Sequence, residues 1–448
     1  MKDTRTFSSL NKEQKEAIGL LSIGTFLEYF DLMLYVHLAV LLNELFFPKT
    51  DPHTASLLSA FAFCSTFVFR PFGALIFGWI GDNISRKATV VITTTIMAFS
   101  CILMANLPAY SQIGIAASWL ITICRILQGI SSVGEIVGAE LYLTEVTKPP
   151  IQYPVVSFIA ISSVIGTAVA LAVASLVTAF GLNWRIAFWM GAAIAMIGAV
   201  ARTALRETPE FADAKRRIKK KYEKANIDQR TLEDDPIFNE KADKQTALYL
   251  FFVNCAWPAC FYFAYIHCGN ILKNSFGYSA ESVIHHNFII SIIQLLGLLL
   301  ISFLSYKIYP LKILKVKLIV FSILILFCPY LLNNINVPFY LFLIQSFIVL
   351  FAVDTVPAVS IFFRHFPVFK RFTYSSLIYA LSRALMYIIT SFGIIYLTKY
   401  FGHYGLLIVM IPINIGCGFG LNHFENLEKK AGYYPQKPSS DPVINSVQ

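Results

Sequence analysis

Charged residues are scarce in this chain. Asp, Glu, Lys and Arg make up 14% of its 448 residues, whereas soluble domains carry about 25%. Hydrophobic residues reach 56%, and the mean hydropathy is +0.64. This balance excludes an ordinary soluble globular protein and predicts a chain that lies largely inside a lipid bilayer.

Paired cysteine motifs are also missing. The eight cysteines form no C-x-x-C pair, and all of them lie within or beside apolar segments. We interpret them as small buried side chains rather than as a disulfide framework or a zinc site. They are Cys64, Cys101, Cys124, Cys255, Cys260, Cys268, Cys328 and Cys417.

Motifs of enzymes are equally absent. The sequence contains no H-E-x-x-H, phosphate-loop or Ser/His/Asp pattern, so we expect no enzyme, no metal site and no cofactor. The net charge of +10 is spread over several loops. Such spreading is typical of a membrane protein and does not predict nucleic-acid binding.

Long apolar runs recur along the whole chain. A helix needs about 20 apolar residues to cross a bilayer, and twelve such runs occur between turn signals. The predicted fold class is therefore an all-α integral membrane protein. Its predicted spans are 17–46, 54–80, 88–107, 113–144, 153–180, 185–205, 246–273, 281–306, 313–332, 338–363, 373–398 and 404–422.

Basic residues gather in alternate loops. The loops after even-numbered spans are rich in them, while the other loops hold little beyond Lys49, Lys273 and Lys399. Because Lys and Arg accumulate on the cytoplasmic side, both termini are predicted to lie inside. The residues counted as cytoplasmic include Arg86, Lys87, Lys148, Lys307, Lys312, Lys315, Lys317, Arg364, Lys370, Arg371, Lys429 and Lys430.

A single long polar segment, 206–245, divides the chain into two sets of six spans. Six spans, a loop and six spans are typical of two halves related by pseudo-symmetry. The predicted domains are an N-terminal six-helix bundle at 1–205, the cytoplasmic central loop and a C-terminal six-helix bundle at 246–422. The short polar tail, 423–448, is predicted to be disordered.

Two carboxylates stand in the first span. Glu28 and Asp31 are three residues apart, which places them on one helix face. An ionisable side chain inside the bilayer costs at least about 2.5 kcal/mol, so it indicates a functional site. Either residue could carry a coupling proton. The alternative is a structural ion pair with Arg70 or Arg125.

The fourth and later spans supply the other candidates. Arg125, Glu135 and Glu140 lie in the fourth span, and a buried Arg suits a substrate carboxylate. Asp354 and Arg383 are charged residues within the tenth and eleventh spans. We expect these residues to bind substrate or protons.

The end of the second span carries the most specific pattern in the chain, in FRPFGALIFGWIGDNISRK. Its glycines permit close helix packing, and Asp82 could bond a neighbouring helix terminus in one state and release it in another. This pattern predicts a gate. The predicted gating residues are Arg70, Gly73, Gly78, Asp82, Arg86 and Lys87.

The segment Gly78–Lys87 resembles the signature between the second and third spans of the major facilitator superfamily. Three further motifs resemble its metabolite:proton symporter branch, which includes proline/betaine and α-ketoglutarate transporters. They are Glu28-Tyr29-Phe30-Asp31, Gln128-Gly129 with Gly134-Glu135, and Glu207-Thr208-Pro209-Glu210-Phe211. The resemblance covers about residues 15–212. It implies two six-helix bundles around a central cavity.

The resemblance also implies a function. The expected protein is a monomer of the cell inner membrane that takes up a small polar carboxylate-bearing metabolite together with protons. Two departures stand against the pattern: Ser85 replaces the usual Gly, and the second-half counterpart near 305–317 lacks the acidic residue and the glycines. This erosion motivates the alternative of a non-transporting sensor or receptor, and exchange without protons also stays open.

Overall fold

The computed structural model describes residues 10–48, 61, 64–203 and 242–435, and all regular elements in these residues are helices. Each predicted span coincides with one helix or with two or three consecutive helical segments, although much of 54–63 lies outside the described residues. The first half contains α1 (Lys12–Phe46), α3 (Arg70–Asn83), α4 (Arg86–Asn106), the short α5 (Tyr110–Ile113), α6 (Ile115–Val146), α7 (Gln152–Ala179) and α8 (Arg185–Arg202).

The second half begins with α10 (Lys244–Phe261), which continues through a π-helical segment into α11 (Cys268–Phe276). The remaining helices are α12 (Ala280–Lys307), α13 (Pro310–Asn333), α14 (Pro338–Phe351), α15 (Val359–Arg364), α16 (Arg371–Ile388), α17 (Ile394–Phe401) and α18 (Gly405–Lys430). Among the described residues, nine helices are long and apolar enough to cross a membrane.

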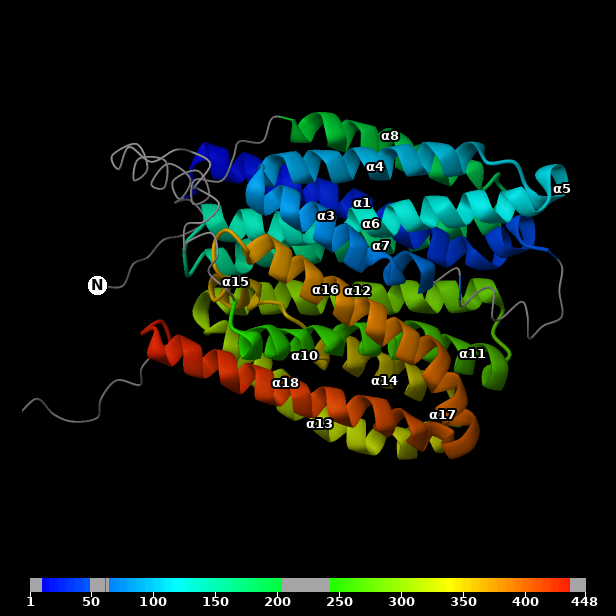
Figure 1. Ribbon diagram of the computed structural model, residues 1–448. Coiled ribbons are helices and arrows are strands. Elements are labelled where there is room, and N and C mark those ends of the chain that lie inside the picture. Colours follow the sequence, from blue (N-terminus) through cyan, green and yellow to red (C-terminus); the bar gives the residue numbers. More distant parts are fainter. Residues whose placement is uncertain (1–9, 49–60, 62–63, 204–241, 436–448) are drawn as a thin grey trace, which may run out of the picture.

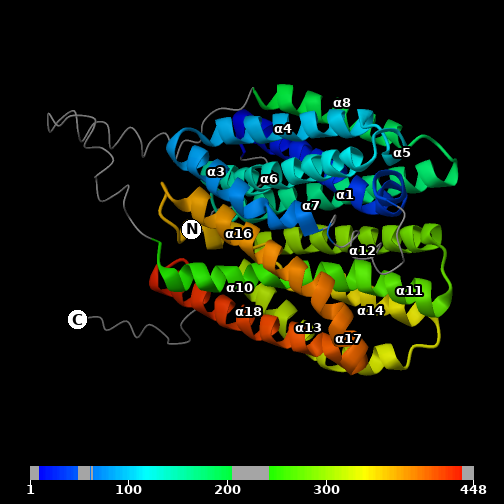
Figure 2. The ribbon, with the colours of Figure 1, turned by 45° about the vertical axis from the view of Figure 1, so that its right-hand side comes forward.

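The helices of the two halves form two groups that lie side by side (Figures 1 and 2). The groups meet where α16 packs on α3 and α12 packs on α7. The described chain begins and ends at the same end of the bundle, which we call the terminal end. Large apolar side chains such as Phe303 and Ile319 remain exposed on the outside, as expected for surfaces that contact lipid.

The tenth span is broken, whereas the sequence predicted a continuous helix over 338–363. α14 ends at Phe351, and α15 begins only at Val359. Pro357 has no backbone N–H and disfavours a helical conformation at Val356. The Asp354 side chain also accepts a hydrogen bond from the Thr355 backbone N–H at 2.7 Å. The prediction used apolar character and overlooked these local signals.

The prediction of a disordered tail from residue 423 is wrong for its first part. α18 runs to Lys430, and the backbone N–H groups of Tyr433 and Tyr434 donate to the Glu428 carbonyl. The Glu428 side chain, fully buried, accepts hydrogen bonds from Tyr309 and His365. Residues 436–448 and most of the predicted central loop lie outside the described residues.

Glycine determines how closely α3 approaches α6. A Cβ atom added at Gly73 would overlap the backbone carbonyl of Ile130. Backbone atoms yield less than side chains, and overpacking costs about 1–3 kcal/mol. We therefore expect Gly73→Ala to lower the melting temperature of the purified protein. Gly19→Ala is the matched control, because nothing lies within 4 Å of its added Cβ; equal melting temperatures for the two variants would contradict the close packing.

Candidate functional site

A cavity lies between the two halves, at the centre of the molecule. It holds about 770 Å³ of non-atom space, part of it open to solvent. The first half lines it with α1, α3, α6 and α7, and the second half with α10, α12, α16 and the break in the tenth span. Its polar lining includes Tyr29, Arg70, Glu140, Ser163, Thr167, Gln294, Asp354, Thr355, Tyr379 and Arg383.

Two buried arginines line this cavity. Arg70 is only 2% exposed, and its guanidinium carbon lies 4.6 Å from the centre of the Phe67 ring. Its Nε and Nη2 atoms have no hydrogen-bond partner among the described residues. Arg383 lies 3.4 Å over the Tyr379 ring and donates to Asn254 Oδ1 at 3.5 Å. The cavity therefore offers unused donors to an anionic group.

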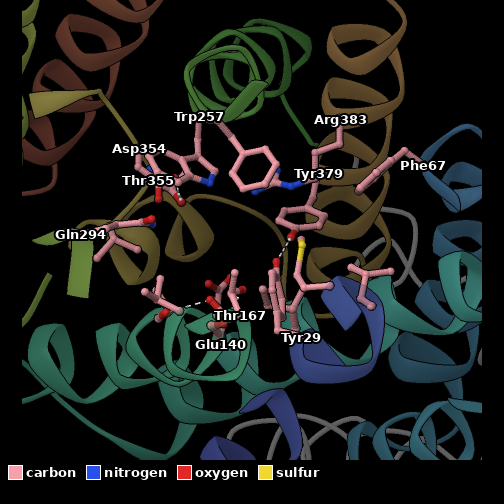
Figure 3. A pocket seen from close by; sticks show the side chains of 18 of the residues that line it. Tyr29, Phe67, Glu140, Thr167, Trp257, Gln294, Asp354, Thr355, Tyr379 and Arg383 are labelled. Atoms are coloured by element: carbon pink, nitrogen blue, oxygen red, sulfur yellow. Dashed lines mark hydrogen bonds between the residues drawn. The ribbon is translucent and has the colours of Figure 1, made fainter. Parts of the chain in front are cut away.

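Two carboxylates lie on opposite walls of the same cavity. Figure 3 shows Asp354 and Thr355 facing Glu140 and Thr167 across the open space. Glu140 is buried in α6, whereas Asp354 is half-buried on the break. The site thus contains both cationic and anionic side chains, and this combination suits a ligand that carries both signs of charge.

Aromatic rings complete the lining. The hydroxyls of Tyr29 and Tyr379, from opposite halves, lie 3.2 Å apart. Phe67 and Tyr387 also meet across the halves, with ring centres 4.1 Å apart. Trp257 and Phe261 add two further rings from α10. Aromatic faces attract cationic groups by cation–π interactions.

Asp31 and Arg125 lie in a separate polar cluster inside the first half. Arg125 is 1% exposed, lies 4.1 Å over the Tyr35 ring and donates to Gln128 Oε1 at 2.9 Å. The Gln128 amide contacts Cys101, which also interacts with Asp31. Neither Asp31 nor Arg125 lines the cavity. The structure therefore assigns the cavity's first-half arginine to Arg70 instead of Arg125.

Asp82 forms one of the inter-half contacts at the terminal end, where Arg371 also pairs with Glu145. The Asp82 carboxylate accepts hydrogen bonds from the backbone N–H groups of Phe372 and Thr373, at 3.1 and 2.8 Å, at the start of α16. It also pairs with Arg86, which in turn contacts Glu145 at 3.5 Å. Asp82 thus caps a helix of the opposite half, a contact of the kind the sequence pattern predicted.

The other predicted gating residues surround this contact. A Cβ added at Gly78 would come within 2.8 Å of the Thr373 Cα, so glycine permits the close approach of α3 to α16. Gly73 lies against α6, Arg70 lines the cavity, and Lys87 is half-buried beside Arg86.

Opening of this contact can be tested with Asp82→Ala. Loss of a helix cap costs about 1 kcal/mol, so a Cys placed at Thr373 should react about fivefold faster or more with an impermeant maleimide. Rates should be measured from the terminal side of oriented vesicles. The neighbouring exposed variant Asn83→Ala should leave the rate unchanged. An equal rate in Asp82→Ala would show that the cap does not hold the halves together.

Among the other predicted site residues, Glu140, Asp354 and Arg383 line the cavity, whereas Glu28 is buried outside its lining. Glu135 lies in α6, but its side chain is outside the described residues.

The sequence interpretation did not identify Trp257, Thr167 or Tyr379, which also line the cavity. An aromatic or Thr residue within an apolar span gives no signal that distinguishes a cavity wall from a lipid contact.

The family model of the Major Facilitator Superfamily matches residues 21–391, which is most of the chain. The chain belongs to the Major Facilitator Superfamily. This family consists of membrane transport proteins without enzymatic activity, which confirms the predicted fold class and the predicted absence of an enzyme.

Curated relatives match over part of their length. The inner membrane metabolite transport protein YhjE of Escherichia coli is 35% identical over 224 residues, 48% of this chain and 51% of the relative. The proline/betaine transporter of the same species is 32% identical over 204 residues, 44% and 41% of the two chains. The chain thus spans about half the length of the curated relatives it matches. These relatives confirm the predicted resemblance.

Solved structures show the same fold. The proton:xylose symporter XylE aligns with a TM-score of 0.75 over 94% of this chain and 96% of that chain, at 13% identity. The human organic anion transporter MFSD10 aligns with a TM-score of 0.68 over 92% and 100% of the two chains, at 15% identity. At such low identity these likenesses concern the fold alone.

Proposed function

We propose that this transporter is a secondary active symporter that takes up a small carboxylate-bearing metabolite together with protons. The observation that carries the proposal is Arg70, a buried cation in the central cavity with two donor atoms that have no hydrogen-bond partner within the described part of the chain. A guanidinium matches a carboxylate in charge and in geometry. Arg383, on the opposite half, offers a second cation, so that one substrate could contact both halves.

The other charges favour a zwitterion over a dicarboxylate. Glu140 faces the same cavity and would repel a second substrate carboxylate, whereas it would attract an ammonium group. The rings of Trp257, Phe261 and Tyr387 suit a methylated ammonium group. Several relatives are named proline/betaine transporters, which supports this class. A dicarboxylate such as α-ketoglutarate is the second candidate.

The coupling proton is assigned to the first-half carboxylates. Asp31 is fully buried, and the next two residues along α1, Leu32 and Met33, line the cavity. Protonation of Asp31 would therefore change the charge directly behind the cavity wall that Leu32 and Met33 form. Glu28 and Glu135 are the other candidates. No cofactor other than the proton is proposed.

Alternating access would proceed by rocking of the two halves about the cavity. The Asp82 contact supports this part of the proposal, because it joins the halves through a bond that can be released. We place the protein in the inner membrane as a monomer, with both termini in the cytoplasm. The terminal end is then the cytoplasmic end.

A radiolabelled uptake screen in proteoliposomes tests the proposal. Proline, glycine betaine and α-ketoglutarate should be compared with and without an inward proton gradient. We expect gradient-dependent accumulation of a zwitterion. Binding without flux would instead favour the sensor alternative, which the eroded second-half signature motivates.

Glu135→Gln gives a test of one proton-carrying candidate. If Glu135 carries the proton, this variant should lose gradient-driven uptake of the substrate identified in the screen. Uptake equal to that of the wild-type protein would remove Glu135 from the coupling mechanism and leave Glu28 and Asp31.

A further inference from the structure

A buried lysine lies behind the cavity wall. Lys317 is only 7% exposed in α13, although the sequence counted it among the cytoplasmic basic residues at the start of the predicted span 313–332. It is seven residues after the start of the helix, which corresponds to about 10 Å along the helix axis. The interior location of a lysine in a membrane protein is costly and points to a partner of opposite charge.

The partner lies on the break in the tenth span. The electrostatic neighbours of the Lys317 ammonium are the Asp354 carboxylate and the Cys260 thiol. Packing brings the two segments together: Val353, Ala256 and Cys417 form a small buried cluster, and Leu318 packs against it. Lys317 directly precedes Leu318 in the sequence, and Asp354 directly follows Val353, so each charged residue is next to a residue of this packing contact.

Asp354 occupies a junction between the cavity and this lysine. It lines the cavity and also interacts electrostatically with Glu140 of α6, Arg383 of α16 and Cys260 of α10. Its Oδ1 atom accepts from the Thr355 backbone N–H and hydroxyl, at 2.7 and 3.3 Å. The carboxylate and the ammonium make no direct contact, so their attraction depends on the position of the break.

The break itself adds negative potential. The Ala352 backbone N–H donates to the Ile348 carbonyl at 2.8 Å, and beyond it the end of the α14 dipole carries partial negative charge. Broken helices in transporters use the carbonyls at such ends to coordinate cations. Here two side-chain cations, Lys317 and Arg383, are electrostatic neighbours of Asp354 on this segment.

We propose that Lys317 is the built-in counter-ion of Asp354, and that it positions the break in the tenth span during transport. The substrate's cationic end is then left to Glu140 and the aromatic rings, because Asp354 is balanced by Lys317. The proposal rests on the proposed transport function only for its uptake assay. Its stability assay is independent of any substrate.

Three variants separate charge from packing. Lys317→Met keeps an unbranched side chain but removes the charge, and it leaves Asp354 with Arg383 as its remaining cationic neighbour. Removing one member of a buried pair is costly, whereas removing both is often neutral. We expect Lys317→Met to lower Vmax for radiolabelled glycine betaine at least about tenfold per folded protein, with KM changed less than about threefold. Lys317→Arg should retain most of the activity.

The decisive variant is the double substitution Lys317→Met/Asp354→Asn. It should recover most of the Vmax lost in Lys317→Met, and its melting temperature should return toward that of the wild-type protein. Lys315→Gln is the matched control, because Lys315 lies two residues away but pairs with Glu425 at the terminal end. This control should retain Vmax and KM.

Two results would overturn the charge pair. One is wild-type Vmax and melting temperature in Lys317→Met. The other is a double variant no more stable and no more active than Lys317→Met. If the wild-type protein does not take up betaine, the proposed substrate fails, and the melting temperatures of the same variants still decide whether Lys317 and Asp354 are paired.

Discussion

Arg70→Gln should raise the KM for the proposed zwitterionic substrate at least about 30-fold, because hydrogen bonds to a charged group contribute about 1.5–3 kcal/mol each. The guanidinium is buried in the cavity, and two of its donor atoms have no partner among the residues that the structure describes, so a neutral amide cannot replace its charge or its geometry. Arg70→Lys should recover little, since an ammonium lacks the planar fork. Initial uptake rates over a range of substrate concentrations measure the effect.

The matched control for this prediction is Lys399→Gln. Lys399 is an exposed basic residue at the end of the bundle opposite the terminal end, far from the cavity lining. Its removal should leave KM unchanged. If Arg70→Gln transports with the wild-type KM, the carboxylate is bound elsewhere, and Arg383 becomes the next candidate.

The second large effect is expected for Asp31→Asn, which should lose accumulation driven by a proton gradient. Asparagine keeps the shape of the side chain but cannot carry the proton. Space for a larger residue is lacking, since a Cβ added at Gly191 would overlap the Asp31 carboxylate. Substrate exchange without a net gradient should persist in the variant, because the cavity lining is unchanged.

Glu281→Gln serves as the control for Asp31→Asn. Glu281 is an exposed carboxylate near the start of α12, and its side chain is 54% exposed. Both variants remove one negative charge, but we expect only Asp31→Asn to uncouple transport from the gradient. Full gradient-driven accumulation in Asp31→Asn would contradict its role as a proton carrier.

The positions of the helices could be predicted because each span requires a long apolar run, whatever it packs against. The run at 313–332 corresponds to α13, and the run at 281–306 corresponds to α12. The break at 352–358 escaped this reasoning, because its residues are almost as apolar as those of a helix. Pro357 was the available signal, and hydropathy alone does not register it.

The candidate site could be predicted only in part. Glu140, Asp354 and Arg383 were identified because a charge within an apolar run is conspicuous. The sequence assigned substrate binding to Arg125 and gating to Arg70, but the packing of α3 and α6 places Arg70 at the cavity and leaves Arg125 outside its lining. Lys317 was counted as a cytoplasmic residue because it follows Lys312 and Lys315 closely. Three lysines within six residues are typical of a cytoplasmic loop.

The central claim is that substrate and protons cross together through the cavity. The most direct test is to add glycine betaine to proteoliposomes that enclose a pH-sensitive dye, with no imposed gradient. We predict acidification of the interior as the substrate enters, abolished by Asp31→Asn and shifted to higher betaine concentrations by Arg70→Gln. Betaine entry at the wild-type rate without acidification would contradict proton coupling.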